Sequence, residues 1–156
     1  MDALIPDIVE VDPADPRVAP LLEAHLTLMR ASSPACSVHA LEAKDLASSG
    51  ARFFAVFLGG EVVAMGALKP LSKRHGEIKS MHVRQDRRGT GLADRVLEYL
   101  FGVAREAGLN RLSLETGSQE IFFPARQFYA RNGFSTCPPF EGYELDPNSV
   151  FMTRTV

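Results

Sequence analysis

Three arginines and two glycines stand together just ahead of a helical pattern, and their chemistry is that of an anion site. They are Arg84, Arg87, Arg88, Gly89 and Gly91. A helix N-terminus offers free backbone N–H groups and a partial positive charge, so it binds phosphate readily. The glycines let a ligand approach the backbone, and the arginines supply mobile positive charge nearby. The pattern predicts a phosphate site, although a tight turn with solvated arginines explains these local residues equally well.

Two well-known phosphate loops do not fit this turn. A P-loop requires G-x-x-x-x-G-K-[ST], and no Gly-Lys dipeptide occurs in the sequence. A dinucleotide-binding turn needs a third glycine in the first strand–helix unit, whereas the run 89–94, GTGLAD, lacks it and follows a predicted hairpin. A nucleotide-dependent oxidoreductase would have to bind NAD, and we expect that this chain does not.

The turn lies within an alternating series of strands and helices. Two aromatic and β-branched runs, 52–58 and 61–68, flank Gly59-Gly60 and predict a β-hairpin. Residues 77–83 predict a third strand, whose imperfect alternation allows a bulge. Apolar residues at helical spacing then predict a helix over 92–107. The anion turn therefore joins a sheet strand to an amphipathic helix.

The remaining elements complete a mixed α/β order. Asp15 is placed to cap a helix with Pro16 in its first turn, and Ser32-Ser33-Pro34 ends that helix. Other helices are predicted at 38–46 and 124–131, and other strands at 8–11, 111–115, 134–136 and 150–153. The order β-α-α-β-β-β-α-β-α-β-β predicts a mixed α/β domain built on a central sheet.

Length and composition favour one globular domain and exclude several functions. The chain has 156 residues, of which 46% are hydrophobic and 23% charged, so a single domain over residues 1–156 is expected. The formal net charge is -2 and no long basic run exists, which argues against nucleic-acid binding. No apolar stretch is long enough to span a membrane and the start does not resemble a signal peptide, so we expect a cytoplasmic protein.

Two sequence blocks carry a resemblance to a known family. Arg88-x-x-Gly91-x-Ala93 fits the pattern [QR]-x-x-G-x-[GA], and the run 125–134, ARQFYARNGF, fits A-x-x-x-Y-x-x-x-G-F. Both patterns, at this separation, are similar to those of the GNAT superfamily of N-acetyltransferases, whose element order also agrees over nearly the whole chain. The segments 76–81, 114–117 and 146–152 resemble a branch of small bacterial GNAT proteins. The resemblance implies a central, mostly antiparallel sheet of about six to seven strands with about four flanking helices.

The resemblance implies acetyl-coenzyme A as co-substrate and no metal. Backbone groups of Met81 and Val83 would contact the pantetheine arm where the sheet separates, and the N–H groups from Arg88 to Ala93 would hold the pyrophosphate. The full set of expected cofactor contacts is Met81, His82, Val83, Arg87, Arg88, Gly89, Thr90, Gly91, Leu92, Ala93 and Tyr129.

The resemblance also implies a general acid. Tyr129 matches the family's tyrosine beside the coenzyme sulfur, where a phenol can protonate the departing thiolate. A core aromatic on an amphipathic helix is the structural alternative for this residue. If the catalytic assignment holds, replacing Tyr129 by phenylalanine lowers turnover while acetyl-coenzyme A affinity stays nearly unchanged.

The general base is less clearly marked. Glu77 lies on the strand that leads to the cofactor, where some relatives carry a catalytic glutamate, and it is our candidate. Glu115 ends the neighbouring strand and could receive the amine proton as well, through water. Either carboxylate could instead be solvated or pair with Lys79 or Arg111. His82 is a third candidate by its intrinsic pKa, but strand alternation turns it away from the face that bears Met81.

The acceptor is not identified by the sequence. In this fold the acceptor usually meets the first two helices and the late loop, here 31–41 and 138–148, and the candidate contacts are Ser33, His39, Glu115 and Tyr143. The late loop is acidic, which suits a cationic amine, although solvation also explains it. A small-molecule or peptide primary amine is expected, and family members often pair through their C-terminal strands, so a homodimer is expected too.

Direct transfer in a ternary complex is the expected route. Cys36 and Cys137 have no recognisable activating neighbour and no metal-type spacing, so an acetyl-cysteine intermediate is disfavoured and both are expected as reduced thiols. The alternative function is a non-catalytic acyl-coenzyme A-binding sensor or interaction module. Release of coenzyme A in the presence of an amine distinguishes the two.

Overall fold

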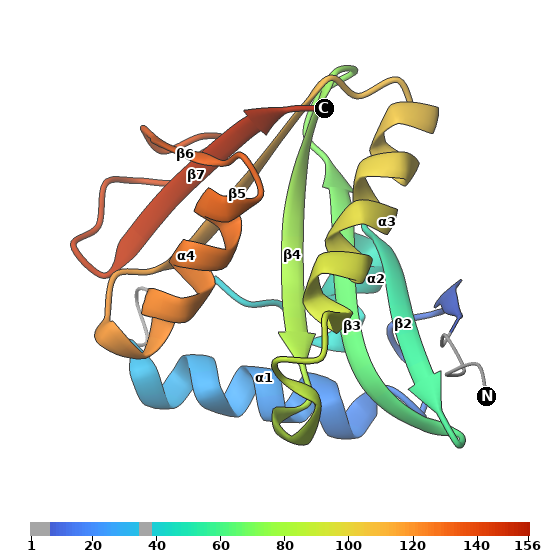
Figure 1. Ribbon diagram of the computed structural model, residues 1–156. Coiled ribbons are helices and arrows are strands. Elements are labelled where there is room, and N and C mark those ends of the chain that lie inside the picture. The colour runs from blue at the N-terminus through green and yellow to red at the C-terminus, as the bar shows by residue number, and fades with distance from the viewer. Residues whose placement is uncertain (1–6, 35–38) are drawn as a thin grey trace.

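The computed structural model describes residues 7–34 and 39–156 and contains a seven-stranded sheet with helices on both faces (Figure 1). The strands are β1 (Ile8–Glu10), β2 (Arg52–Leu58), β3 (Glu61–Pro70), β4 (His75–Val83), β5 (Arg111–Gly117), β6 (Ser135–Cys137) and β7 (Ser149–Thr155). The α-helices are α1 (Ala19–Ser32), α2 (Ala43–Ser48), α3 (Leu92–Glu106) and α4 (Phe123–Arg131). The predicted mixed α/β class and the predicted order of strands and helices are confirmed.

The sheet opens between its two central strands. Its order is β1-β2-β3-β4-β5-β7-β6, and every neighbouring pair is antiparallel except β4 and β5, which are parallel. The β4–β5 register contains only three pairs, from His75↔Arg111 to Glu77↔Ser113, and the two strands then diverge (Figure 1). Beyond Glu77, the side of β4 that faces β5 is therefore free to border a cavity.

A bulge in β4 lies at the start of this divergence. The register of β3 against β4 shifts between Met65 and Ala67, and Ser80 of β4 has a positive φ of 56°. A bulge re-aims the side chains that follow it and increases the local twist of the strand. The imperfect alternation of the sequence over residues 77–83 has this cause, and the expected bulge is confirmed.

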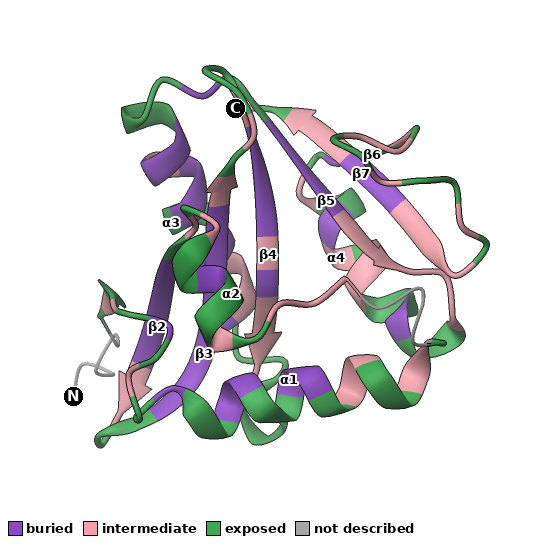
Figure 2. Cartoon of the chain, turned by 180° about the vertical axis from the view of Figure 1, so that it is seen from behind, coloured by how far each residue is buried: buried purple, intermediate pink, exposed green. Residues whose placement is uncertain are grey.

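Two apolar clusters fix the helices to the sheet. Helices α3 and α4 cover one face, with Leu97, Leu100 and Tyr129 among the buried residues of that cluster. Helices α1 and α2 cover the other face through Leu22 and Leu46 (Figure 2). On the α3 side, a Cβ atom at Gly66 would lie 2.8 Å from Met81 Sδ and 3.0 Å from Val96 Cγ1, so glycine is what allows this close contact between strand and helix.

The first two helices depart from the predicted boundaries. Helix α1 begins at Ala19, with Pro20 in its first turn, because Asp15 Oδ1 accepts the Arg17 N–H at 2.9 Å and caps a separate turn. The second helix was expected over 38–46 and instead spans Ala43–Ser48. Cys36 lies outside the described residues. No helix within the described residues is long and apolar enough to cross a membrane.

Candidate active site

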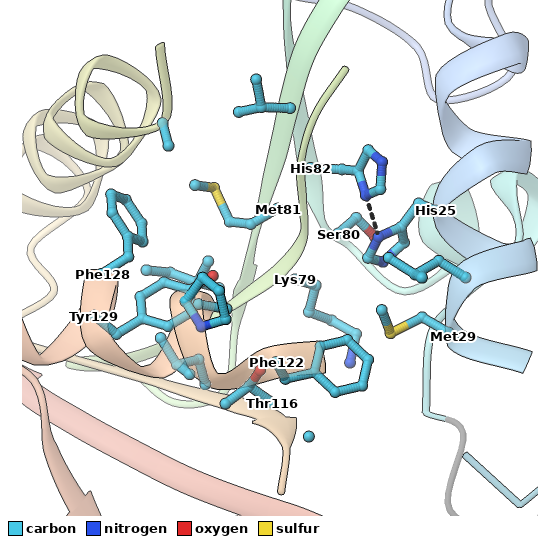
Figure 3. A pocket seen from close by; sticks show the side chains of 18 of the residues that line it. His25, Met29, Lys79, Ser80, Met81, His82, Thr116, Phe122, Phe128 and Tyr129 are labelled. Atoms are coloured by element: carbon cyan, nitrogen blue, oxygen red, sulfur yellow. Dashed lines mark hydrogen bonds between the residues drawn. The ribbon is translucent and has the colours of Figure 1, made fainter. Parts of the chain in front are cut away.

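A cavity of about 460 Å³ occupies the opening between β4 and β5. Its walls come from both strands, from α1 and α4, and from the turn before α3, so that segments distant in sequence meet there. Figure 3 shows Tyr129 and Phe128 on one side, with His25 and Met29 of α1 on the other. The divergence of two parallel strands thus creates one continuous space between the anion turn and the buried polar residues of the sheet.

The predicted anion turn has the geometry that its glycines require. Gly89 and Gly91 have φ angles of 77° and 86°, in the left-handed region that glycine adopts without cost, and a Cβ atom at either position would meet nothing within 4 Å. Gly91 is the N-cap of α3, so the first N–H groups of the helix point towards the cavity end that Arg87 and Arg88 line. The combination can hold a phosphate group through backbone N–H groups and two guanidinium groups.

Two residues of the turn do not behave as expected. Arg84 was expected to be mobile, but its guanidinium is held by Asp86 at 2.6 Å and by Glu61 at 3.2 Å. Thr90 does not line the cavity, since its hydroxyl donates a hydrogen bond back to the Arg87 carbonyl. The other predicted cofactor contacts all line the cavity, and they are Met81, His82, Val83, Arg87, Arg88, Gly89, Gly91, Leu92, Ala93 and Tyr129.

Tyr129 lies on α4, where it both belongs to the core and borders the cavity. It is 7% exposed and packs against Phe134 at a ring distance of 5.7 Å. Burial raises the pKa of its phenol well above the usual range, so the group is neutral and keeps its proton at neutral pH. The two interpretations of this residue, core aromatic and proton donor, are therefore compatible.

Glu77 is buried within a network of three polar side chains. Its Oε2 accepts hydrogen bonds from the Tyr143 hydroxyl at 2.6 Å and from Lys79 Nζ at 3.1 Å, and Lys79 also donates to the Tyr143 oxygen at 2.9 Å. The partner of Glu77 is thus Lys79 rather than Arg111, and Tyr143 reaches it from the late loop. Burial and the neighbouring Glu77 carboxylate raise the pKa of Tyr143, which keeps its hydroxyl protonated.

Glu115 forms a second, more accessible carboxylate at the same end of the cavity. Its Oε2 accepts the Ser149 hydroxyl at 2.8 Å, and its Oε1 lies 3.4 Å from His39 Nδ1. Burial raises the pKa of Glu115, while Ser149 and His39 act in the opposite direction. Ser33 lies nearby on the cavity wall and accepts a hydrogen bond from Gln119 at 3.2 Å. Three of the four predicted acceptor contacts, Ser33, His39 and Glu115, therefore line the cavity, whereas Tyr143 does not line it and packs against the His39 ring.

A pair of histidines was not predicted. The Nδ1 atoms of His25 on α1 and His82 on β4 lie 3.1 Å apart, and both residues line the cavity (Figure 3). Burial lowers the pKa of His25 to about 3 and that of His82 to about 4, so both rings are neutral at neutral pH. The only sequence signal was the polar residue His25 on the apolar face of a predicted helix. His82 does face away from Met81, which packs towards α3.

A family model described as the acetyltransferase (GNAT) family matches residues 18–134, which include the anion turn and the Tyr129 helix. The chain belongs to the GNAT family of acetyltransferases. Curated proteins similar to this chain are named N-acetyltransferases, which agrees with the family match, so this GNAT protein is an acyltransferase. The N-acetyltransferase YsnE of Bacillus subtilis (strain 168), itself uncharacterized, is 44% identical over 88% of this chain and 91% of its own length.

Further similarities agree with this assignment. The uncharacterized N-acetyltransferase YedL of Escherichia coli (strain K12) is 39% identical over 93% of this chain and 91% of its own. A structure from Klebsiella pneumoniae subsp. pneumoniae MGH 78578, described as an acyl-CoA N-acyltransferase, has a TM-score of 0.79 at 27% identity and covers 97% of both chains. A GNAT acetyltransferase of Elizabethkingia anophelis with acetyl-CoA bound shares the fold, with a TM-score of 0.70 at 16% identity over 96% of this chain and 97% of its own.

Proposed function

We propose that this GNAT acetyltransferase transfers the acetyl group of acetyl-coenzyme A to a primary amine, directly and within a ternary complex. The observation that carries the proposal is the cavity that joins the anion turn to Tyr129 and to the carboxylates of Glu77 and Glu115. The anion turn fits a pyrophosphate because its glycines leave the backbone open and Arg87 and Arg88 face the same space. Acetyl-coenzyme A in a solved relative of the same fold supports the choice of donor.

The open side of β4 supports the placement of the acyl arm. Pairing with β5 ends at Glu77, so the backbone from Lys79 to Val83 borders the cavity on that side without a β5 partner. Backbone polar groups at such a position need other hydrogen-bond partners, and the Val83 carbonyl accepts one from Arg88 Nε at 3.3 Å. We propose that the backbone of Met81 and Val83 binds the pantetheine arm and orients the thioester carbonyl.

Tyr129 is the proposed general acid. Its phenol stays protonated because burial raises its pKa, and it lines the wall opposite α1 (Figure 3). A neutral phenol can donate its proton to the departing thiolate and recover it from solvent. We expect Tyr129→Phe to lower kcat by about tenfold or more while the Kd for acetyl-coenzyme A stays nearly the same.

The assay for this proposal follows thiol release from acetyl-coenzyme A over a panel of primary amines. Tyr99→Phe is the matched control, because Tyr99 is 40% exposed on α3 and does not line the cavity. Unchanged kcat in Tyr129→Phe would remove Tyr129 from the mechanism. Tight coenzyme binding without thiol release from any amine would favour a non-catalytic acyl-coenzyme A sensor instead.

Glu77 is the proposed general base. Its carboxylate lines the cavity and, among the described residues, is held by the Tyr143 hydroxyl at 2.6 Å and by Lys79 Nζ at 3.1 Å, so that it can receive the amine proton through water. Glu115 is the second candidate, since burial raises the pKa of its carboxyl group. The dependence of kcat/KM on pH separates the two, because the substitution that removes the base, Glu77→Gln or Glu115→Gln, abolishes the acidic limb of the profile.

A further inference from the structure

The charged side chains along the cavity fall into two groups. At the α3 end, Arg87 and Arg88 line the wall, and Arg131 lies 3.4 Å from Asp94. At the β5 end, the charged groups are Glu77, Lys79 and Glu115. The proposed function assigns the two arginines of the first group to the coenzyme phosphates. The charge of an acceptor must therefore be matched by the second group.

Lys79 is already neutralised by Glu77. Their charged atoms lie 3.1 Å apart, and the side chains are only 9% and 4% exposed. The remaining contact of Lys79 Nζ is the Tyr143 hydroxyl at 2.9 Å. Separating this buried pair would leave a desolvated carboxylate without a cationic partner, which is strongly unfavourable. Lys79 is thus not available to an anionic group of the acceptor.

The histidines add no cation that could replace it. His25 and His82 share a close Nδ1–Nδ1 contact of 3.1 Å, which accommodates one proton between the rings and not two. His39 lies 3.4 Å from Glu115 and is charged only when protonated. Within the described part of the chain, no other lysine or arginine lines the β5 end of the cavity. Because the charges of Lys79 and Glu77 cancel, the carboxylate of Glu115 gives the β5 end of the cavity a net negative charge at alkaline pH.

The opposite wall of the same end is apolar. Leu28 and Met29 of α1 face the space, together with Ile121 and Phe122 from the turn before α4. Figure 3 shows Met29 and Phe122 on neighbouring sides of the opening. Apolar walls of this kind favour an acceptor whose body buries hydrocarbon surface.

From this arrangement we infer that the acceptor is a monoamine with an apolar body and no carboxylate group. Glu115 binds the ammonium group of this amine, and the site excludes amino acids. The inference rests on the proposed function and narrows its substrate. An amino acid would bring a carboxylate into a space whose lysine is paired and whose remaining charge is negative. Desolvation of that group without a cationic partner is unfavourable, and the like charge of Glu115 adds repulsion.

The test compares amines with the amino acids that differ from them by one carboxylate. The pairs are 2-phenylethylamine with phenylalanine and 3-methylbutylamine with leucine, measured by calorimetry at pH 8 on the full chain saturated with coenzyme A. We expect the amine of each pair to bind about tenfold tighter or more. Equal or tighter binding of the amino acid in either pair, or binding of neither amine, would overturn the inference.

Two substitutions test the charge argument itself. Glu115→Gln keeps the shape of the side chain and removes its charge, and the preference for the amine over the amino acid is expected to become smaller. Lys79→Met leaves Glu77 unpaired, so the site should then prefer butane-1,4-diamine, a dication, over butylamine. If Lys79→Met does not fold, Lys79→Gln is measured in its place, with circular dichroism as the check on folding. An unchanged preference in both variants contradicts the inference.

Thiol release with the same compounds separates this inference from the proposed function. Selective amine binding without thiol release supports the predicted selectivity of the site but refutes acetyl transfer, so the amine would then be a ligand and not an acceptor. Faster thiol release with the amino acids than with the amines refutes the inference and leaves acetyl transfer intact.

Discussion

The histidine pair makes the stability of the protein sensitive to mild acid. His25 is 7% exposed, and burial lowers its pKa from 6.5 to about 3. The unfolded chain exposes the ring and restores its ordinary pKa, so between these two values the unfolded state binds one proton more than the folded state. The free energy of unfolding therefore falls as the pH decreases through this window. The perturbation is a change from pH 7 to pH 5 in the wild type and in His25→Gln.

The size of the effect follows from the pKa difference. Each proton taken up on unfolding gives a slope of about 1.4 kcal/mol per pH unit, so the span from pH 6.5 to pH 5 removes about 2 kcal/mol through His25 alone. His82 acts in the same direction, because burial and then Arg88 lower its pKa to about 4, but its ring is more exposed and its contribution smaller. Carboxylates contribute equally to both proteins and cancel in the comparison.

Urea unfolding at the two pH values measures this difference. We expect the loss of unfolding free energy between pH 7 and pH 5 to be smaller in His25→Gln than in the wild type by about 2 kcal/mol. His75→Gln is the control, since His75 is only partly buried and its pKa is less strongly lowered, so its effect should be smaller. An equal loss in His25→Gln and the wild type would show that His25 is not held neutral in the folded state.

Three further predictions concern packing, backbone strain and the polar network. Gly66→Ala should lower the free energy of unfolding by about 1–3 kcal/mol in thermal or urea unfolding, because its Cβ would lie 2.8 Å from Met81 Sδ in a filled core. Gly91→Ala should cost about 1 kcal/mol through its φ of 86°, whereas Gly102→Ala, in the interior of α3 with open space around it, should gain about 0.5–1 kcal/mol by the same assay. Tyr143→Phe should cost about 1–3 kcal/mol, because Glu77 loses a buried hydrogen bond.

The order of elements was predictable because local patterns dominate most of it. The hairpin combines two β-rich runs with the turn Gly59-Gly60, and the helix over 92–107 combines helical periodicity with a glycine after its end. Both occur as predicted apart from their last residue or two. The predicted start of α1 was wrong because Asp15 and Pro16 fit the rules for a helix cap but form a separate turn before the helix. The predicted bounds of the second helix, 38–46, were wrong because the pattern is short, and helix propensity over so few residues is a weak signal.

The residues of the site were predictable from the sequence only where they belong to a recognisable sequence motif. The anion turn and Tyr129 belong to two such motifs, and the structure brings both to one cavity. His25 could not be assigned, because its contact with His82 joins residues on α1 and β4 that no local spacing relates. The contact of Tyr143 with Glu77 likewise depends on how the late loop lies over the sheet. Contacts of this kind arise from tertiary packing, which periodicity does not encode.

Several unfavourable features of the fold lie along β4 where it borders the cavity, and they are an argument for binding there. The central strand pair separates after Glu77, Ser80 adopts a positive φ of 56°, and the Ser80 hydroxyl is buried without a hydrogen-bond partner among the described residues. A non-glycine residue in the left-handed region costs on the order of 1 kcal/mol, and a buried unpaired polar group costs a similar amount. Packing elsewhere must offset these costs, since the apolar clusters on both faces of the sheet contain no comparable feature in the described residues. A ligand that bonds to the open edge of β4 would recover part of the cost on binding, which is the physical reason to expect the acyl arm at this edge.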